Sequence, residues 1–283
     1  MRINKNIASL NIYKAYSQNI KKQSASLGRI SSGVKINSSK EDPNAIAQSE
    51  RLRMQIRGLQ MAARNTQDGV SMLQTSQGGM NGITESLQRV RELVVKAGGT
   101  TSDADKGIIQ NEINQMIQGA DDLANNTEFN GVKLLVGGAN NGSVSIETVT
   151  GANVGEKIDI PKYNLNAEGL DLNFTDADGI DVKNIDVNDI DGSLQSIDTA
   201  LDVVIGARSK YGALENRFES SYNSTMGMAE KIQSAESGIR DTDMAEEIME
   251  YAKYNILIEA STAMMAQSNR FPQDALKILE NVR

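Results

Sequence analysis

The sequence predicts a mainly α-helical protein. Both termini form a long antiparallel coiled-coil or helical-rod hairpin, and a small middle region contains β-hairpins. Apolar side chains recur every seven residues near both ends of the chain, which is typical of helices that pack along a narrow seam. Only three prolines occur in 283 residues, and the periodicity changes to strand-like alternation in the middle.

The opening segment, residues 3–30, carries a stripe of apolar residues that is too thin for a globular core. One heptad row is apolar, whereas the row three residues earlier continues with serines. Two paired helices bury one stripe each, so we expect the remaining apolar side chains to pack against other copies of the chain. These subunit-packing positions are Ile3, Ile7, Leu10, Tyr13, Ile20 and Leu27, with Ile248, Ala252 and Ile256 in the last helix.

A second helix is predicted from residue 43 to residue 97. Asp42 suits the N-cap and Pro43 the first helical position. Heptad rows then continue for about 50 residues, a length of roughly 75 Å at ~1.5 Å per residue. The sequence GGMNG at 78–82 weakens the middle of this helix and favours a bend. The sequence GGTTSD at 98–103 ends it and supplies the N-cap of a shorter helix.

The periodicity changes between residues 129 and 192. An Asn-Gly pair beside a β-branched run in FNGVKLLVGG (129–138) predicts a hairpin, and SVSIETVT (143–150) alternates as a strand does. Residues 164–192 hold eight acidic side chains against one lysine. We therefore expect a short variable region of hairpins and loops at 136–192.

Helical periodicity returns at residue 194 and continues for over 40 residues, and a last helix is predicted at 243–268. Residues 1–64 carry 12 Lys/Arg against 3 Asp/Glu, whereas residues 230–283 carry 6 against 10. These opposite charge balances favour a pairing of the first helix with the last. The pairing would bring both termini to one end of a rod.

The composition excludes several kinds of chemistry. The sequence has no Cys and no His, so disulfides, Cys/His zinc sites and nucleophilic catalysis by either side chain are absent. The stretch VNDIDGSLQSID (187–198) fits a calcium loop poorly, because Val187 stands at the first ligand position and Asp198 at the last. No glycine-rich phosphate loop occurs. We expect no catalytic residue, no cofactor and no metal, and a protein that is not an enzyme.

The sequence also predicts neither a membrane segment nor a nucleic-acid site. No apolar run is long enough to cross a bilayer, and residues 1–30 lack the apolar block of a cleaved signal peptide. The basic residues near the N-terminus are spread over several helical turns and form no dense patch, so nucleic acid is not expected as a partner.

Several long motifs resemble the bacterial flagellin family. The N-terminal region of that family is similar to SLGRISSGVKINSSKEDPNAIAQSERLRMQIRGLQMAARNTQDGVSMLQT (26–75), SLQRVRELVVKA (86–97) and EFNGVKLL (128–135). Its C-terminal region is similar to IDTALDVVIGARSKYGALENRFE (197–219) and DTDMAEEIMEYAKYNILIEASTAMMAQSN (241–269). The resemblance covers about 135 residues at the front and 90 at the back.

The resemblance implies a structural subunit that self-assembles into the helical flagellar filament used for motility. It implies an inner terminal coiled-coil domain at 1–42 with 240–283, a helical-rod domain at 43–135 with 193–239, and the variable region at 136–192. Terminal segments of the family are disordered in the monomer and fold on assembly. The chain is expected to be extracellular, in the flagellum, and to be exported without a cleaved signal peptide.

The resemblance also implies a set of partners. Besides other copies of the chain, these are the flagellar export apparatus, an export chaperone, the filament cap and the Toll-like flagellin receptor of animal hosts. Packing between neighbouring subunits is expected to be the main role of the receptor-sensed residues. The matching positions are Gln88, Arg89, Leu93, Ile109 and Glu112.

Two alternatives share some of these features. A hook–filament junction (hook-associated) protein has the same terminal helices, and a secreted coiled-coil adhesin would share the heptads. The dense matches at 36–58 and at 216–219 favour flagellin. Long tubes of purified protein under the electron microscope would exclude the adhesin.

Overall fold

The computed structural model describes the chain except for residues 1–5, 100–101, 138–143, 176–180, 184 and 282–283. The chain divides into two compact units. Residues 1–54 with 231–283 form one, here called the terminal unit, and residues 55–230 form the other, the central unit. The three-part division expected from the sequence stays a prediction.

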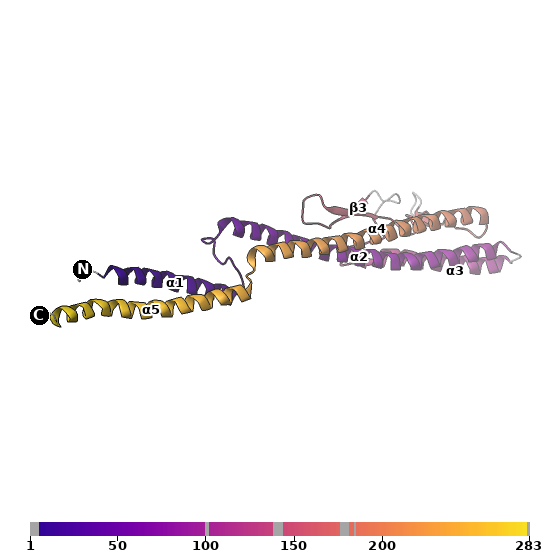
Figure 1. Cartoon of the computed structure of the whole chain (residues 1–283). Coiled ribbons are helices and arrows are strands. Elements are labelled where there is room, and N and C mark those ends of the chain that lie inside the picture. Colours follow the sequence, from indigo (N-terminus) through magenta and orange to yellow (C-terminus); the bar gives the residue numbers. More distant parts are fainter. Residues whose placement is uncertain (1–5, 100–101, 138–143, 176–180, 184, 282–283) are drawn as a thin grey trace. The chain divides into compact units, whose positions relative to one another are not determined.

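Two long helices make up most of the terminal unit (Figure 1). They are α1 (Ile7–Ser32) and α5 (Met244–Asn281), and they pack against each other. Asn6 caps α1 by accepting a hydrogen bond from the backbone N–H of Ser9 at 3.1 Å. Gly33 ends the helix with a φ of 69°, a left-handed conformation that costs glycine little because it has no Cβ.

A short backbone bridge lies between the end of α1 and the start of α5. Val34 and Asp241 pair in antiparallel orientation. The backbone N–H of Lys35 donates to the carbonyl of Arg240 at 2.6 Å. This bridge fixes the point from which the two helices run alongside each other.

The last helix continues past Pro272, so its predicted end at residue 268 is wrong. Proline has no N–H, which leaves the carbonyl four residues earlier, that of Ser268, without its helical donor. The side-chain amide of Asn6 donates to this carbonyl at 2.9 Å. A contact from the start of α1 therefore satisfies the acceptor that Pro272 leaves open.

Three helices of the central unit run alongside one another (Figure 1), and their buried side chains belong to one hydrophobic core. They are α2 (Pro43–Ala97), α3 (Asp103–Asn126) and α4 (Ile190–Arg240). Asp42 caps α2 as predicted, since its carboxylate accepts from the backbone N–H groups of Asn44 and Ala45 at 3.0 Å each. The largest fully buried side chains in these helices are Leu73, Met80, Ile83, Leu87, Leu93, Ile113, Tyr211 and Phe218.

The middle of α2 continues as helix through the GGMNG sequence. A Cβ on Gly79 would lie 2.5 Å from Thr127 Oγ1 and 2.9 Å from Leu135 Cδ1, whereas a Cβ on Gly78 would meet nothing within 4 Å. Gly79 thus lets the chain after α3 approach α2 closely. Gly78 has no such packing role.

Among the described residues between 128 and 183, six strands form three separate two-stranded antiparallel hairpins. The predicted Asn-Gly turn is confirmed, since Asn130 and Gly131 have φ values of 52° and 77°, the positive values that a tight hairpin turn requires. The strands are β1 (Glu128–Phe129), β2 (Val132–Lys133), β3 (Val144–Val149), β4 (Lys157–Lys162), β5 (Asn173–Thr175) and β6 (Asp181–Lys183).

The second hairpin and the chain after it supply part of the core. Ile158, Ile160 and Tyr163 are buried in the same cluster as the buried residues of α2, α3 and α4. Tyr211 of α4 donates its hydroxyl to the carbonyl of Pro161 at 2.7 Å, and burial raises the pKa of Tyr211. The region expected as a separate variable insert is therefore bound into the central unit by apolar packing.

Candidate subunit interface

The side of α1 that packs against α5 is only partly apolar. Most of the less exposed positions of α1 recur at steps of three and four, and this spacing places them in one row on the side that faces α5. Four of the seven members are polar, and Ser26 is the one that is fully buried. This row, here called the inner row, consists of Ser9, Ile12, Tyr16, Asn19, Gln23, Ser26 and Ile30.

Polar contacts from this side of α1 reach α5. Gln23 donates its side-chain amide to Asn255 at 3.1 Å. Arg29 pairs with Glu247 at 3.3 Å, and the Glu247 side chain is only 7% exposed. Separating the two partners would leave the covered Glu247 carboxylate without compensation, so helix alignments that break this pair are disfavoured.

The predicted subunit-packing residues lie on the other faces of the two helices. A row offset by one residue from the inner row of α1 contains the large apolar side chains, and it remains exposed. The exposed fractions are 64% for Ile7, 53% for Leu10, 58% for Tyr13, 39% for Ile20, 52% for Leu27, 52% for Ile248 and 65% for Ile256. Ala252 is also exposed, and Ile3 lies outside the described residues.

The terminal unit therefore places much of its apolar surface outward. Large exposed apolar patches on a soluble chain mark interaction surfaces. Sequence reasoning selected the row with the larger side chains and missed the inner row, because a row of Ser, Asn and Gln looks like a solvated face. The signal for the inner row is the helical spacing of Ile12, Tyr16 and Ile30.

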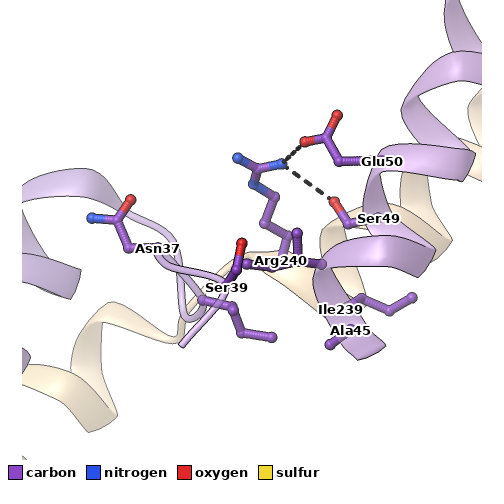
Figure 2. Close-up of a pocket in the computed structure, with 9 residues that line it drawn as sticks. Asn37, Ser39, Ala45, Ser49, Glu50, Ile239 and Arg240 are labelled. Carbon is purple, nitrogen blue, oxygen red and sulfur yellow. Dashed lines mark hydrogen bonds and ion pairs between the residues drawn. The ribbon is translucent and has the colours of Figure 1, made fainter. Parts of the chain in front are cut away.

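A small cavity of about 180 Å³ lies in the terminal unit, where the loop after α1 meets the first turns of α2 and the last turn of α4. Figure 2 shows Arg240 reaching from α4 toward Ser49 and Glu50, to which it donates at 3.3 and 3.1 Å. Hydrogen bonds from Arg240 and then Arg53 lower the pKa of Glu50. Both charged side chains that line the cavity are thus already paired within the unit.

The five residues predicted for receptor contact separate into two groups. Gln88 and Arg89 are exposed and Glu112 is half-buried, whereas Leu93 and Ile109 are 1% and 6% exposed and belong to the hydrophobic core. Arg89 donates to the carboxylate of Glu112 at 3.3 Å. The structure brings only the polar members together on an accessible surface.

The acidic stretch at the start of α4 has a structural role. The carboxylate of Asp189 accepts from the backbone N–H of Gly192 at 3.2 Å, in the first turn of the helix. Within the described residues, no three or more acidic side chains lie close enough together to hold a metal ion. The same residues include no helix with the length and apolarity needed to cross a bilayer.

Comparisons with known proteins agree with this arrangement, in which helical regions at both ends of the chain flank a shorter middle region. Residues 3–140 match the bacterial flagellin N-terminal helical region, and residues 194–279 match the bacterial flagellin C-terminal helical region. A flagellin of Bacillus subtilis is 39% identical over 99% of this chain and 100% of its own length. The chain therefore belongs to the bacterial flagellin family.

Further relatives and solved structures are consistent with the family. The flagellar filament 30.7 kDa core protein of Treponema maltophilum is 37% identical over 99% of this chain and 100% of its own length. A solved structure described as a flagellar hook-associated protein of Vibrio parahaemolyticus has a TM-score of 0.56 at 15% identity, and covers 71% of this chain and 100% of its own. At that identity the likeness concerns the fold alone.

Proposed function

We propose that this chain is the structural subunit of a bacterial flagellar filament and that copies bind one another through the exposed faces of α1 and α5. One observation carries the proposal. α1 turns a row with four polar members of seven toward α5, and the two helices leave Leu10, Tyr13, Ile248 and Ile256 exposed. The apolar area that drives association is therefore available on the free subunit.

The energetics favour a polymer over an isolated helix pair. Burying a large apolar side chain is worth about 1.5–3 kcal/mol, and several such side chains per subunit are more than half exposed. Each subunit in a filament repeats the same contacts, so small gains per side chain accumulate along the polymer. A head-to-tail contact that does not close on itself produces an open helical assembly.

We further propose the route by which the chain reaches the filament. It leaves the cell through the flagellar export apparatus without a cleaved signal peptide, accompanied by an export chaperone, and is added beneath the filament cap. The polar inner row of α1 supports this route, because a helix pair with little buried apolar area opens easily. The filament is extracellular, and the proposal includes no catalytic role.

Recognition by the Toll-like flagellin receptor of animal hosts is proposed for the exposed polar members of the predicted surface only. Gln88, Arg89 and Glu112 lie within reach of a partner. Leu93 and Ile109 contribute by supporting α2 and α3 from within the core. Arg89→Ala should therefore weaken receptor signalling with little loss of stability, as measured with soluble monomer in a reporter-cell assay.

Substitution of Leu10 by aspartate tests the proposed assembly. The side chain is 53% exposed, so covering the remainder is worth roughly 1 kcal/mol, and a carboxylate placed in an apolar contact adds a desolvation cost. We expect Leu10→Asp to raise the protein concentration needed for seeded filament growth about tenfold or more. Asn11→Asp is the matched control, because it adds the same charge one residue away at an exposed polar position.

Sedimentation of seeded filaments and thermal melting of the monomer give the two readouts. Leu10→Asp should reduce the pelleted fraction strongly and leave the melting temperature of the monomer nearly unchanged, while Asn11→Asp should assemble normally. Normal assembly of Leu10→Asp would contradict the proposed role of this face. An equal loss in both variants would indicate a charge effect in place of a packing effect.

A further inference from the structure

Methionine is abundant and unusually accessible in this chain. The sequence has 12 methionines, and among the described residues seven methionines are between 36% and 69% exposed. The thioether is flexible and apolar, so it suits contact surfaces that must adapt to a partner. It is also the side chain that mild oxidants attack when it is accessible.

Two of these methionines lie on the outer face of α5, away from the side that α1 covers. Met249 is 66% exposed and Met264 is 57% exposed. Each belongs to a row of apolar side chains spaced by seven residues along the helix. One row is Met249, Ile256 and Ala263, and the other is Leu257, Met264 and Phe271.

We propose that Met249 and Met264 form a reversible oxidation site that controls assembly. Subunits add to the filament readily when both thioethers are reduced and need a higher concentration to add when they are oxidised to sulfoxides. The inference rests on the proposed function, because assembly is the event that covers the outer face of α5.

The oxidation is a two-electron transfer of one oxygen atom from a peroxide. The methionine sulfur attacks one oxygen of hydrogen peroxide, an S–O bond forms while the O–O bond breaks, and water leaves after proton transfer. The sulfur is oxidised and the peroxide is reduced. Methionine sulfoxide reductases return the thioether at the expense of a thiol reductant, so the modification can be reversed.

A sulfoxide changes the properties on which the contact depends. It is polar and accepts hydrogen bonds without donating one, whereas the other members of both rows, seven residues away, are apolar. A buried acceptor without a partner weakens an interface. We expect each sulfoxide to raise the concentration required for assembly by about tenfold.

Mass spectrometry and seeded sedimentation test the proposal on the full chain. Monomer and preformed filament are treated with hydrogen peroxide, and the oxygen content of each methionine is measured. Met249 and Met264 should oxidise in the monomer and be protected in the filament, while the core residues Met72 and Met80 should stay reduced in both. Treated monomer should assemble poorly and should recover after incubation with the two epimer-specific sulfoxide reductases.

Leucine variants separate these two residues from the others. Met249→Leu/Met264→Leu keeps the apolar volume and should assemble with or without peroxide. Met61→Leu/Met228→Leu is the matched control, since these central-unit methionines are 53% and 52% exposed, and it should remain sensitive to peroxide. Equal sensitivity of the two double variants would overturn the assignment.

Two further outcomes distinguish this inference from the proposed function. If untreated protein forms no filaments, the proposed function fails and the inference fails with it. If untreated protein assembles and oxidised protein assembles equally well, only the oxidation proposal is overturned. Oxidation of Met249 and Met264 in the filament at the monomer rate would also overturn it, because assembly would then leave this face open.

Discussion

Alanine substitutions at the adjacent glycines Gly78 and Gly79 should change stability in opposite directions. Glycine in a helix interior costs about 0.8–1.0 kcal/mol relative to alanine, and a Cβ on Gly78 meets nothing within 4 Å. The same gain applies at Gly79. There, however, the Cβ would lie 2.5 Å from Thr127 Oγ1 and 2.9 Å from Leu135 Cδ1.

The two atoms next to Gly79 are held in place. Thr127 donates its hydroxyl to the carbonyl of Leu123 at 2.6 Å, and Leu135 is completely buried. Overpacking of this kind typically costs about 1–3 kcal/mol. We therefore expect Gly78→Ala to stabilise the chain by up to about 1 kcal/mol and Gly79→Ala to destabilise it by up to about 2 kcal/mol.

Denaturant unfolding followed by circular dichroism measures the difference directly. The same substitution in the same helix gives each variant nearly equal propensity, so their difference isolates the packing around Gly79. If both variants are stabilised, the contacts with Thr127 and Leu135 relax without cost and the reasoning is refuted. Equal destabilisation of both would mean that Gly78 makes a contact that the structure lacks.

Five other outcomes are expected. Tyr163→Phe should keep or raise the free energy of unfolding, measured with denaturant, since among the described residues the buried hydroxyl of Tyr163 has no hydrogen-bond partner. In the same assay Tyr211→Phe should lower the free energy of unfolding by about 0.5–1.5 kcal/mol, because it removes the hydrogen bond to Pro161. Because burial raises the pKa of Tyr211, the contribution of Tyr211 to the free energy of unfolding should be complete below the usual tyrosine pKa of about 10 and should decline at higher pH. An unfolding midpoint that is flat from pH 9 to pH 11 would contradict this. Amide hydrogen exchange should show helices 7–32 and 244–281 weakly protected in the monomer and strongly protected in the filament. Deleting residues 140–190 should lower the melting temperature of the chain by many degrees, because Ile160 and its neighbours leave the core; an unchanged value would mean that the three helices close over the gap.

Local signals in the sequence were sufficient to predict most helix boundaries. Asp42 and Pro43 mark the start of α2, and Asn130 marks the first hairpin turn. The end of α5 was not predictable from such signals. Pro272 is normally a helix terminator, and the contact of Asn6 with Ser268, more than 260 positions apart in the chain, supplies the donor that the proline lacks.

The sequence was sufficient to predict which residues of α1 belong to the candidate interface, but not which side of α1 packs against α5. Heptad spacing identifies Tyr13, Ile20 and Leu27 as members of one row, and the structure confirms that they share one exposed side of α1. Heptad spacing could not show that α5 packs against the neighbouring row, whose members are mostly polar. That choice depends on pairings between distant residues such as Arg29 with Glu247.

Because Val34 pairs with Asp241, the number of residues between α1 and this bridge sets which side of α1 faces α5. Each residue of an α-helix turns the chain by about 100°, and the exposed row of α1 follows the inner row by one position. A single residue inserted between Ile30 and Val34 would therefore rotate Leu27, Ile20, Tyr13 and Leu10 onto α5. α1 and α5 would then bury more apolar side chains between them and expose fewer to other chains, although the residues of both rows stay the same. On the proposal that this row binds other copies, the helical phase set at the bridge determines whether the row faces α5 or a neighbouring chain.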